Sequence, residues 1–351
     1  MASTIEISLP NGLKYKQPTN LFINNKFVNT TGDDFTVYNP AGVTHLRLSI
    51  FCQPKQRTDE KIITIRGASA KDVDKTVEAA RRAFEGEWSE LAAVDRRAFL
   101  FKIAELVDRD RKLLASIDAF DNGNTYTAAL EGDLDESYNV FRHYAGATDK
   151  ITGRTIETSP NPWGRHIDQA QELPLHDASL ESNPSPAWQH PHPKTNRTNP
   201  QHKKILSYID QGKSSGARLL HGSAKTGSKG YYLEPTVFAD TTEDIAIVRD
   251  EIFGLAVAIA KFSTVDEVVA KANDTLNGLA AALFAEKVAR AHTVARRLQA
   301  GMVWINSSGH SHFGIPFGGY KSSGIGSELG QYALDAYTQS KAVHVNLGSK
   351  L

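Results

Sequence analysis

Apolar side chains recur at helical spacing from residue 69 onwards. The first stripe consists of Val73, Val77, Ala80 and Phe84. Intervals of four, three and four residues place these side chains on one face of a helix. Ser69 stands before the stripe and Asp72 follows three residues later, so the pair predicts a capping box at the helix start.

Two more helices are predicted before residue 125. One covers 95–107, with an inner face made of Phe99, Ile103, Leu106 and Val107. The next runs through 113–120 and is stopped by Gly123, because glycine tolerates the left-handed backbone that ends helices.

Shorter apolar runs predict strands. Residues 21–28 read as a hairpin whose turn is Asn24-Asn25, since asparagine tolerates positive φ. Further strands are predicted at 35–38, 58–65, 217–220, 232–238 and 302–305. A helix is predicted over 201–212, ending at Gly212.

Composition narrows the class of protein. The 351 residues carry 40 Lys and Arg against 40 Asp and Glu, so no charge excess favours nucleic acid or an anionic membrane as a partner. One cysteine excludes an internal disulfide and fits a reducing compartment. No apolar run approaches the roughly 18–20 residues that span a bilayer. We therefore expect a soluble cytoplasmic protein with no secretory signal.

Two segments interrupt the pattern of regular elements. Residues 160–200 hold 8 of the 14 prolines, and proline removes backbone donors, so an irregular linker is predicted there. Residues 42–57 interrupt the N-terminal strands and contain Cys52; they are interpreted as an insertion. The four histidines of the linker match no tetrahedral metal motif, so no metal site is predicted.

Four strings in the C-terminal part carry the functional information. They are Glu251-Ile-Phe-Gly254, Asn273-Asp-Thr-Leu-Asn-Gly-Leu-Ala280, Ala300-Gly-Met-Val-Trp-Ile-Asn306 and Pro316-Phe-Gly-Gly-Tyr-Lys-Ser-Ser-Gly324. In this order and spacing they resemble the C-terminal half of an aldehyde dehydrogenase. The resemblance covers 1–41, 58–159 and 201–351.

The resemblance implies an α/β fold that is incomplete. It predicts a partial cofactor-binding domain over 1–159, with the insertion at 42–57, and the linker at 160–200. A partial catalytic domain follows at 201–322, and 323–351 form an oligomerisation segment. The family oxidises aldehydes to carboxylates with NAD or NADP, so a small aldehyde is the implied substrate and a homo- or hetero-oligomer the implied assembly.

Two catalytic strings of the family have no match in this chain. The family's cysteine nucleophile belongs to a Gly-Gln-x-Cys string, and its general-base glutamate to a Glu-Leu-Gly-Gly string. Cys52 has no basic residue placed with it to lower its pKa, so an inert thiol is the expectation. We therefore predict no catalytic residue and an inactive chain.

Some of the family's cofactor-binding residues remain recognisable in this chain. By resemblance, Glu251 would bind the nicotinamide ribose hydroxyls, Phe253 would pack beside the nicotinamide, and Gln201 and Lys204 would lie near the adenine-side ribose. From the residues alone, Glu251 reads equally as a solvated loop carboxylate and Lys204 as a helix surface charge.

Three hypotheses stay open at this point. The chain is an inactive family member, a non-catalytic subunit that oligomerises with a full-length relative, or a faulty product of a misread gene without a stable fold. Sequencing the full-length transcript across 42–57 and 160–200 separates the last from the others. The natural aldehyde and the choice between NAD and NADP are not encoded in any motif found.

Overall fold

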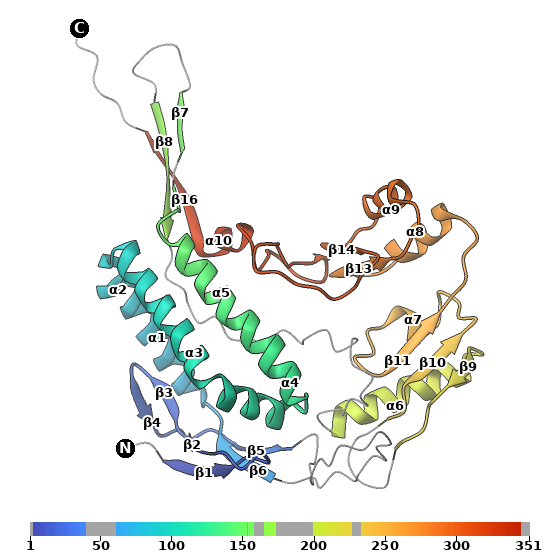
Figure 1. The fold of residues 1–351 in the computed structure, drawn as a ribbon, viewed down its shortest axis with the longest axis horizontal. Helices are drawn as coiled ribbons and strands as arrows, with labels where there is room; N and C mark the ends of the chain where they lie inside the picture. Colours follow the sequence, from blue (N-terminus) through green and yellow to red (C-terminus); the bar gives the residue numbers. More distant parts are fainter. Residues whose placement is uncertain are drawn as a thin grey trace.

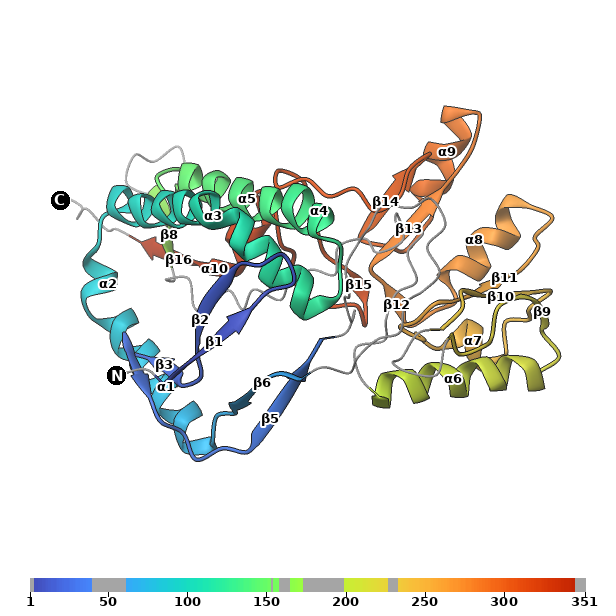
Figure 2. The same ribbon diagram turned by 60° about the horizontal axis from the view of Figure 1, so that its bottom comes forward.

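The computed structural model describes residues 3–39, 61–152, 154–157, 165–172, 199–226 and 233–344. The predicted insertion at 42–57, with Cys52, lies outside these residues. The described elements are helices and short sheets arranged around an open arc (Figure 1). In both views, helix α6 and sheet β11-β10-β9 stand apart from helices α3 and α5 (Figure 1, Figure 2).

The N-terminal part consists of three antiparallel strand pairs and a group of helices. The strands are β1 (Thr4–Ser8), β2 (Lys14–Pro18), β3 (Leu21–Ile23), β4 (Lys26–Val28), β5 (Asp34–Tyr38) and β6 (Lys61–Arg66). The helices are α1 (Ala70–Glu85), α2 (Glu87–Glu90), α3 (Ala93–Asn122), α4 (Tyr126–Ala128), the π-helical turn η1 (Ala129–Asp133) and α5 (Leu134–Ala147). The hairpin prediction is confirmed: Asn24 and Asn25 have φ of 50° and 58°.

The capping box at the start of α1 is confirmed. Asp72 is buried and accepts hydrogen bonds from the Ser69 amide at 3.1 Å and the Thr30 hydroxyl at 2.7 Å. The hydrogen bonds from the Ser69 and Thr30 side chains hold the pKa of Asp72 well below its usual range. This carboxylate therefore joins the loop after β4 to the first turn of α1.

Helix α3 corrects the prediction of two separate helices. It runs without a break through 108–112, a charged stretch that the sequence pattern assigned to a connection. The charges are compatible with a helix because they pair along it and across to α5. Arg111 pairs with Asp108 at 3.7 Å and with Asp135. Gly123 ends the helix in the left-handed conformation, as predicted, with φ of 78°.

The apolar stripe of α1 and the predicted inner face of α3 are largely uncovered. Val73 and Val77 are 52% and 60% exposed, and Phe99 and Ile103 are 53% and 39% exposed. The prediction of an inner face is wrong for Phe99 and Ile103, because no segment among those described covers them. Amphipathic spacing identifies an apolar face but not the presence of a partner for it.

A second group of elements forms an extended sheet. Strands β7 (Arg154–Glu157), β8 (Arg165–Glu172) and β16 (Thr338–His344) pair in the order β16-β8-β7, all antiparallel. Helix α10 (Tyr332–Tyr337) leads into β16. Strand β8 lies inside the segment predicted to be an irregular linker, so that prediction is wrong over 165–172. The physical reason is that the prolines of 160–200 flank this strand and none falls within it.

The third group surrounds a small core. Its elements are α6 (Asn199–Ser214), β9 (Arg218–His221), β10 (Thr236–Ala239), α7 (Ala246–Arg249) and β11 (Ala256–Ile259). Strand β10 lies between β11, to which it is parallel, and β9, to which it is antiparallel. The predicted strand at 232–238 is shorter at its start, where Leu233 makes only an isolated bridge to Lys225. The buried core residues are Ile205, Ile209, Ala217, Leu233, Phe238, Ile247 and Ile252.

The fourth group carries three of the sequence strings. It comprises α8 (Val265–Asn273), β12 (Asn277–Gly278), β13 (Ala280–Leu283), α9 (Val288–Ala295), β14 (Met302–Ile305) and β15 (Tyr320–Lys321). The predicted strand at 302–305 is confirmed as β14, and its four residues are half-buried. The segment that follows reaches back to α5: the Tyr144 hydroxyl donates to the Gly330 carbonyl at 3.2 Å, and the ring of Phe313 lies 5.1 Å from that of His143.

Two carboxyl groups face each other where η1 meets α3, and they predict a pH effect on stability. Burial, followed by the charge of Asp118, raises the pKa of Asp133 from 3.8 to about 6. Stability from the bound proton is complete below the unfolded value and is lost as the pH rises through 6. We expect Asp133→Asn to be about 1–2 kcal/mol more stable than the parent near pH 7.5, after allowance for solvent screening.

Urea unfolding at about pH 4.5 and 7.5 checks this expectation. The amide should remove the loss of stability that ionisation of Asp133 causes between the two conditions. Glu131→Gln, an exposed change in the same π-helical turn, is the matched control. An equal loss of stability with rising pH in the parent and in Asp133→Asn contradicts the assignment.

Candidate functional site

The loop after α7 holds two of the predicted site residues. Ile252 is buried in the core, whereas Glu251 and Phe253 on either side are exposed, with the Phe253 side chain 63% exposed. Phe253 has φ of 54°, a conformation that non-glycine residues adopt rarely. One buried anchor thus presents a carboxylate and an aromatic ring to the outside from the same short loop.

Helix α6 brings the other two predicted residues to this loop. The Gln201 side-chain amide donates to the Phe253 carbonyl at 3.4 Å, and the Lys204 ammonium donates to the Glu251 carbonyl at 3.3 Å. The structure therefore gathers all four predicted residues, although about 50 positions separate the two pairs. In this arrangement Gln201 and Lys204 hold the loop backbone, and their place near an adenine-side ribose stays a prediction.

Two further residues take part in the same contact and were not predicted from the sequence. The Tyr208 hydroxyl donates to the Asp250 carboxylate at 3.1 Å, and the Lys204 ammonium lies 5.7 Å from the Tyr208 ring centre. Tyr208 stands four residues after Lys204, on the same face of α6. That spacing of four residues was the sequence signal from which a contact between Lys204 and Tyr208 could have been predicted.

Gly254 fixes how closely the loop approaches α6, and this contact yields a prediction. A Cβ at position 254 would stand 2.5 Å from Cδ1 and 2.6 Å from Cγ1 of Ile205, which is fully buried. Gly254→Ala should therefore destabilise the protein by about 1–3 kcal/mol through overpacking. Thermal unfolding followed by circular dichroism measures the loss. Recovery in Gly254→Ala/Ile205→Ala, which removes all three contacted side-chain carbons of Ile205, tests the cause.

The strings at 300–306 and 316–324 form strands β14 and β15 and their adjoining turns. The Asn306 side chain accepts from the Ala285 amide at 2.8 Å and donates to the Ala285 carbonyl at 3.0 Å, so it closes a loop. The turn at 317–319 is held by reciprocal backbone hydrogen bonds between Phe317 and Glu328 at 2.6 and 2.7 Å. Both roles are structural in this arrangement.

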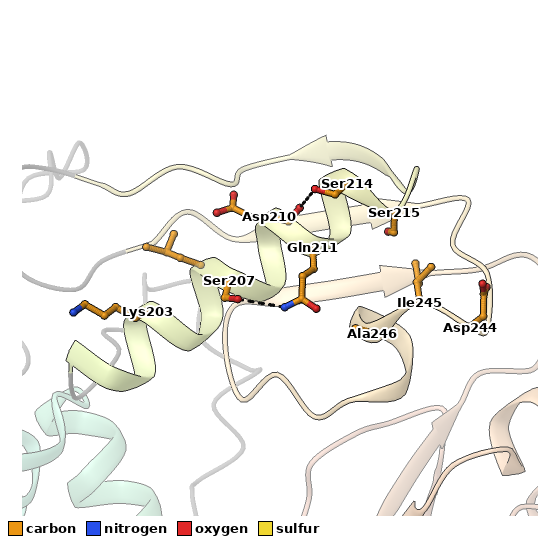
Figure 3. Close-up of a pocket in the computed structure, with 10 residues that line it drawn as sticks. Lys203, Ser207, Asp210, Gln211, Ser214, Ser215, Asp244, Ile245 and Ala246 are labelled. Carbon is orange, nitrogen blue, oxygen red and sulfur yellow. Dashed lines mark hydrogen bonds between the residues drawn. The ribbon is translucent and has the colours of Figure 1, made fainter.

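A shallow hollow lies elsewhere on α6, between this helix and the start of α7. Figure 3 shows the residues that line it, among which the Gln211 side-chain amide donates to the Ser207 hydroxyl at 3.3 Å. None of the four predicted site residues lines it. Among the described residues, no group of three or more His, Cys, Asp or Glu could hold a metal ion, and no helix is long and apolar enough to cross a membrane.

Comparison with known proteins decides the family. The model of the aldehyde dehydrogenase family matches residues 50–174 and 195–343, which is most of the chain. The chain belongs to the aldehyde dehydrogenase family. The match includes 50–57, 160–174 and 195–200, which lie outside the ranges covered by the resemblance found in the sequence strings.

Individual relatives agree with this assignment. An aldehyde dehydrogenase of Aspergillus niger is 29% identical, with 98% of each chain covered. A protein of Macroscelides proboscideus named "Aldehyde dehydrogenase, cytosolic 1" is 26% identical, with 95% of this chain and 96% of the relative covered. The aldehyde dehydrogenase of Bacillus cereus solved in complex with NAD+ is 26% identical, with a TM-score of 0.80 over 95% of this chain and 97% of that chain. The α/β aldehyde dehydrogenase-like fold and the oxidoreductase family predicted from the four strings are thus confirmed.

The alignment with the Aspergillus niger relative is longer than this chain. It extends over 506 positions, whereas the chain has 351 residues. At least 155 positions, the difference between the two numbers, therefore have no residue of this chain opposite them. Because 98% of each chain is covered, these unmatched positions are gaps between matched segments and not missing ends.

Proposed function

We propose that this chain retains the nicotinamide side of the family's cofactor site but does not oxidise aldehydes. One observation carries the proposal: the chain has a single cysteine, Cys52, and lacks both catalytic strings of the family. A thioester cannot form without a placed thiolate. The 155 unmatched positions support the interpretation of a truncated family member.

The residues present fit one half of an NAD(P) molecule. When bound, NAD(P) supplies the hydride acceptor of the family reaction. The exposed Glu251 carboxylate can accept hydrogen bonds from the two ribose hydroxyls, and the exposed Phe253 ring can pack against the nicotinamide. For the phosphates, no Gly-x-Gly-x-x-Gly string follows a predicted strand. We therefore expect weak binding through the nicotinamide end, in a cytoplasmic protein.

Two measurements test this proposal separately. Purified chain mixed with NAD+ or NADP+ and a panel of aldehydes should give no absorbance increase at about 340 nm, and Cys52→Ala should behave identically.

The affinity for NADH, followed by fluorescence, should weaken about tenfold in Glu251→Gln, because the substitution removes a charge-assisted hydrogen bond. Aldehyde-dependent NADH formation that Cys52→Ala abolishes would falsify the first part. Equal NADH affinity of the parent and Glu251→Gln contradicts the second.

The second candidate is a non-catalytic subunit that assembles with a full-length relative. Sheet β16-β8-β7 favours it, because the sheet projects from the rest of the chain in Figure 1. Strands β16 and β7 each pair on one side only among the described strands, and free strand edges are sites for pairing with another chain. Native mass spectrometry after co-expression with a complete relative tests it: mixed assemblies support the role, and separate populations reject it.

A further inference from the structure

Three consecutive carbonyl groups at the end of α8 accept hydrogen bonds from cations of two distant segments. The Lys321 ammonium donates to the Asn273 carbonyl at 2.6 Å and to the Thr275 carbonyl at 3.1 Å. The Arg249 guanidinium donates to the Asp274 carbonyl between them at 2.9 Å. Carbonyls at a helix C-terminus lack partners within the helix and attract positive charge. The positive charges of Lys321 and Arg249 are therefore stabilised by the carbonyl groups at this helix end.

The side chains of the same segment add further connections. The Asp274 carboxylate pairs with the Arg249 guanidinium at 2.8 Å, and this partner lowers the pKa of Asp274. The Asn273 side chain donates to the Arg297 carbonyl at 2.8 Å and accepts from the Gln299 amide at 2.8 Å. Residues 273–275, named here the α8 hub, thus contact α7, the segment after α9 and β15.

Each of the two cations is close in sequence to a different loop. Arg249 is the last residue of α7 and precedes Glu251 by two residues. Glu251 lies in the loop whose backbone accepts a hydrogen bond from Lys204 of α6. Lys321 lies in β15, directly after the turn at 317–319, and its backbone pairs with Asn277 of β12. Lys321 also has φ of 55°, and a conformation of this kind persists only where the surroundings fix it.

We propose that the α8 hub positions the 250–253 loop relative to the turn at 317–319, with Arg249 and Lys321 as its two positioning residues. Lys321 thereby influences Glu251 and Phe253 without touching them. The coupling stands on these contacts; only its consequence for ligand affinity rests on the cofactor role proposed above.

Amide hydrogen exchange on the full chain tests the proposal. In Lys321→Met the 273–278 segment loses two charge-assisted hydrogen bonds, and exchange at 250–256 should also become about tenfold faster. Lys321→Arg retains a cationic donor and should keep slow exchange at both segments. Lys287→Met, an exposed change at the start of α9, should leave both unchanged.

A second variant guards against general loss of folding. Asp274→Asn keeps all three carbonyl acceptors but removes the charge facing Arg249, so it should accelerate exchange at 250–256 while α3 and α5 keep their parental rates. Faster exchange at 273–278 with unchanged exchange at 250–256 in both Lys321→Met and Asp274→Asn overturns the proposal. NADH affinity is measured in parallel. If the parent does not bind NADH, the cofactor proposal fails, and the exchange result still decides the coupling.

Discussion

Replacing Gly301 by alanine should lower the free energy of unfolding by about 3 kcal/mol, because a methyl group has no room there. A Cβ at this position would stand 1.9 Å from the Gly318 carbonyl oxygen and 2.8 Å from its carbon. Both obstacles are backbone atoms of the tight turn, so rotation of a side chain cannot relieve the overlap. The strand β14 and the turn at 317–319 must therefore separate, which also removes the hydrogen bond from the Gly301 amide to the Gly278 carbonyl at 3.0 Å.

Urea unfolding of the parent and the variant measures this loss. Gly146→Ala in α5 is the matched control, because a Cβ there meets no atom within 4 Å and alanine favours helix by about 1 kcal/mol. The two Gly→Ala changes should thus act in opposite directions. A Gly301→Ala protein as stable as the parent contradicts the close approach of the two backbones.

Local signals in the sequence predicted the elements that depend on local chemistry. The Asn24-Asn25 turn and the Ser69/Asp72 capping box follow from the conformational preference of asparagine and from a side chain that bonds its own helix start. These preferences act within a few residues. They therefore operate in the same way whatever the rest of the chain does.

Glycine at 212 shows where local reasoning fails. The sequence predicted the end of the helix there, yet α6 continues to Ser214. A Cβ at 212 would stand 2.8 Å from Cζ of Phe238, so this glycine permits close packing of α6 on β10. Gly216, with φ of 86°, follows the end of the helix. Glycine is required at 212 by the packing of α6 on β10, which are distant in sequence, and no local pattern contains that information.

The candidate site was predicted only through resemblance to a family. Spacing alone could not show that Gln201 and Lys204 contact the backbone of Phe253 and Glu251, because the two pairs lie in separate elements. The arrangement exists because Ile205, on the same helix, packs against Gly254 and anchors the loop. The uncovered apolar faces of α1 and α3 show the opposite case, in which the local pattern is present but no described segment packs on it. The alignment with a relative contains 155 positions for which this chain has no residue, and a sequence pattern within one helix does not register that absence.

Phe238→Ala should cost about 3–5 kcal/mol of unfolding free energy, the usual range for a buried aromatic side chain. Phe238 is 1% exposed and lies at the centre of the core formed with Ile205 and Ile209 of α6. Such a loss is a large share of the stability of an ordinary domain. Because α6 also holds the 250–253 loop, the variant should accelerate amide exchange in that loop together with α6 itself.

Phe262→Ala removes the same atoms from an exposed position and is the matched control. Phe262 is 56% exposed, so its loss should change the unfolding free energy by less than about 0.5 kcal/mol. Urea titrations of both variants compare the two changes directly. Similar, small effects from both would mean that α6 and β10 do not share a packed core, and the support that α6 gives to Glu251 and Phe253 would lose its basis.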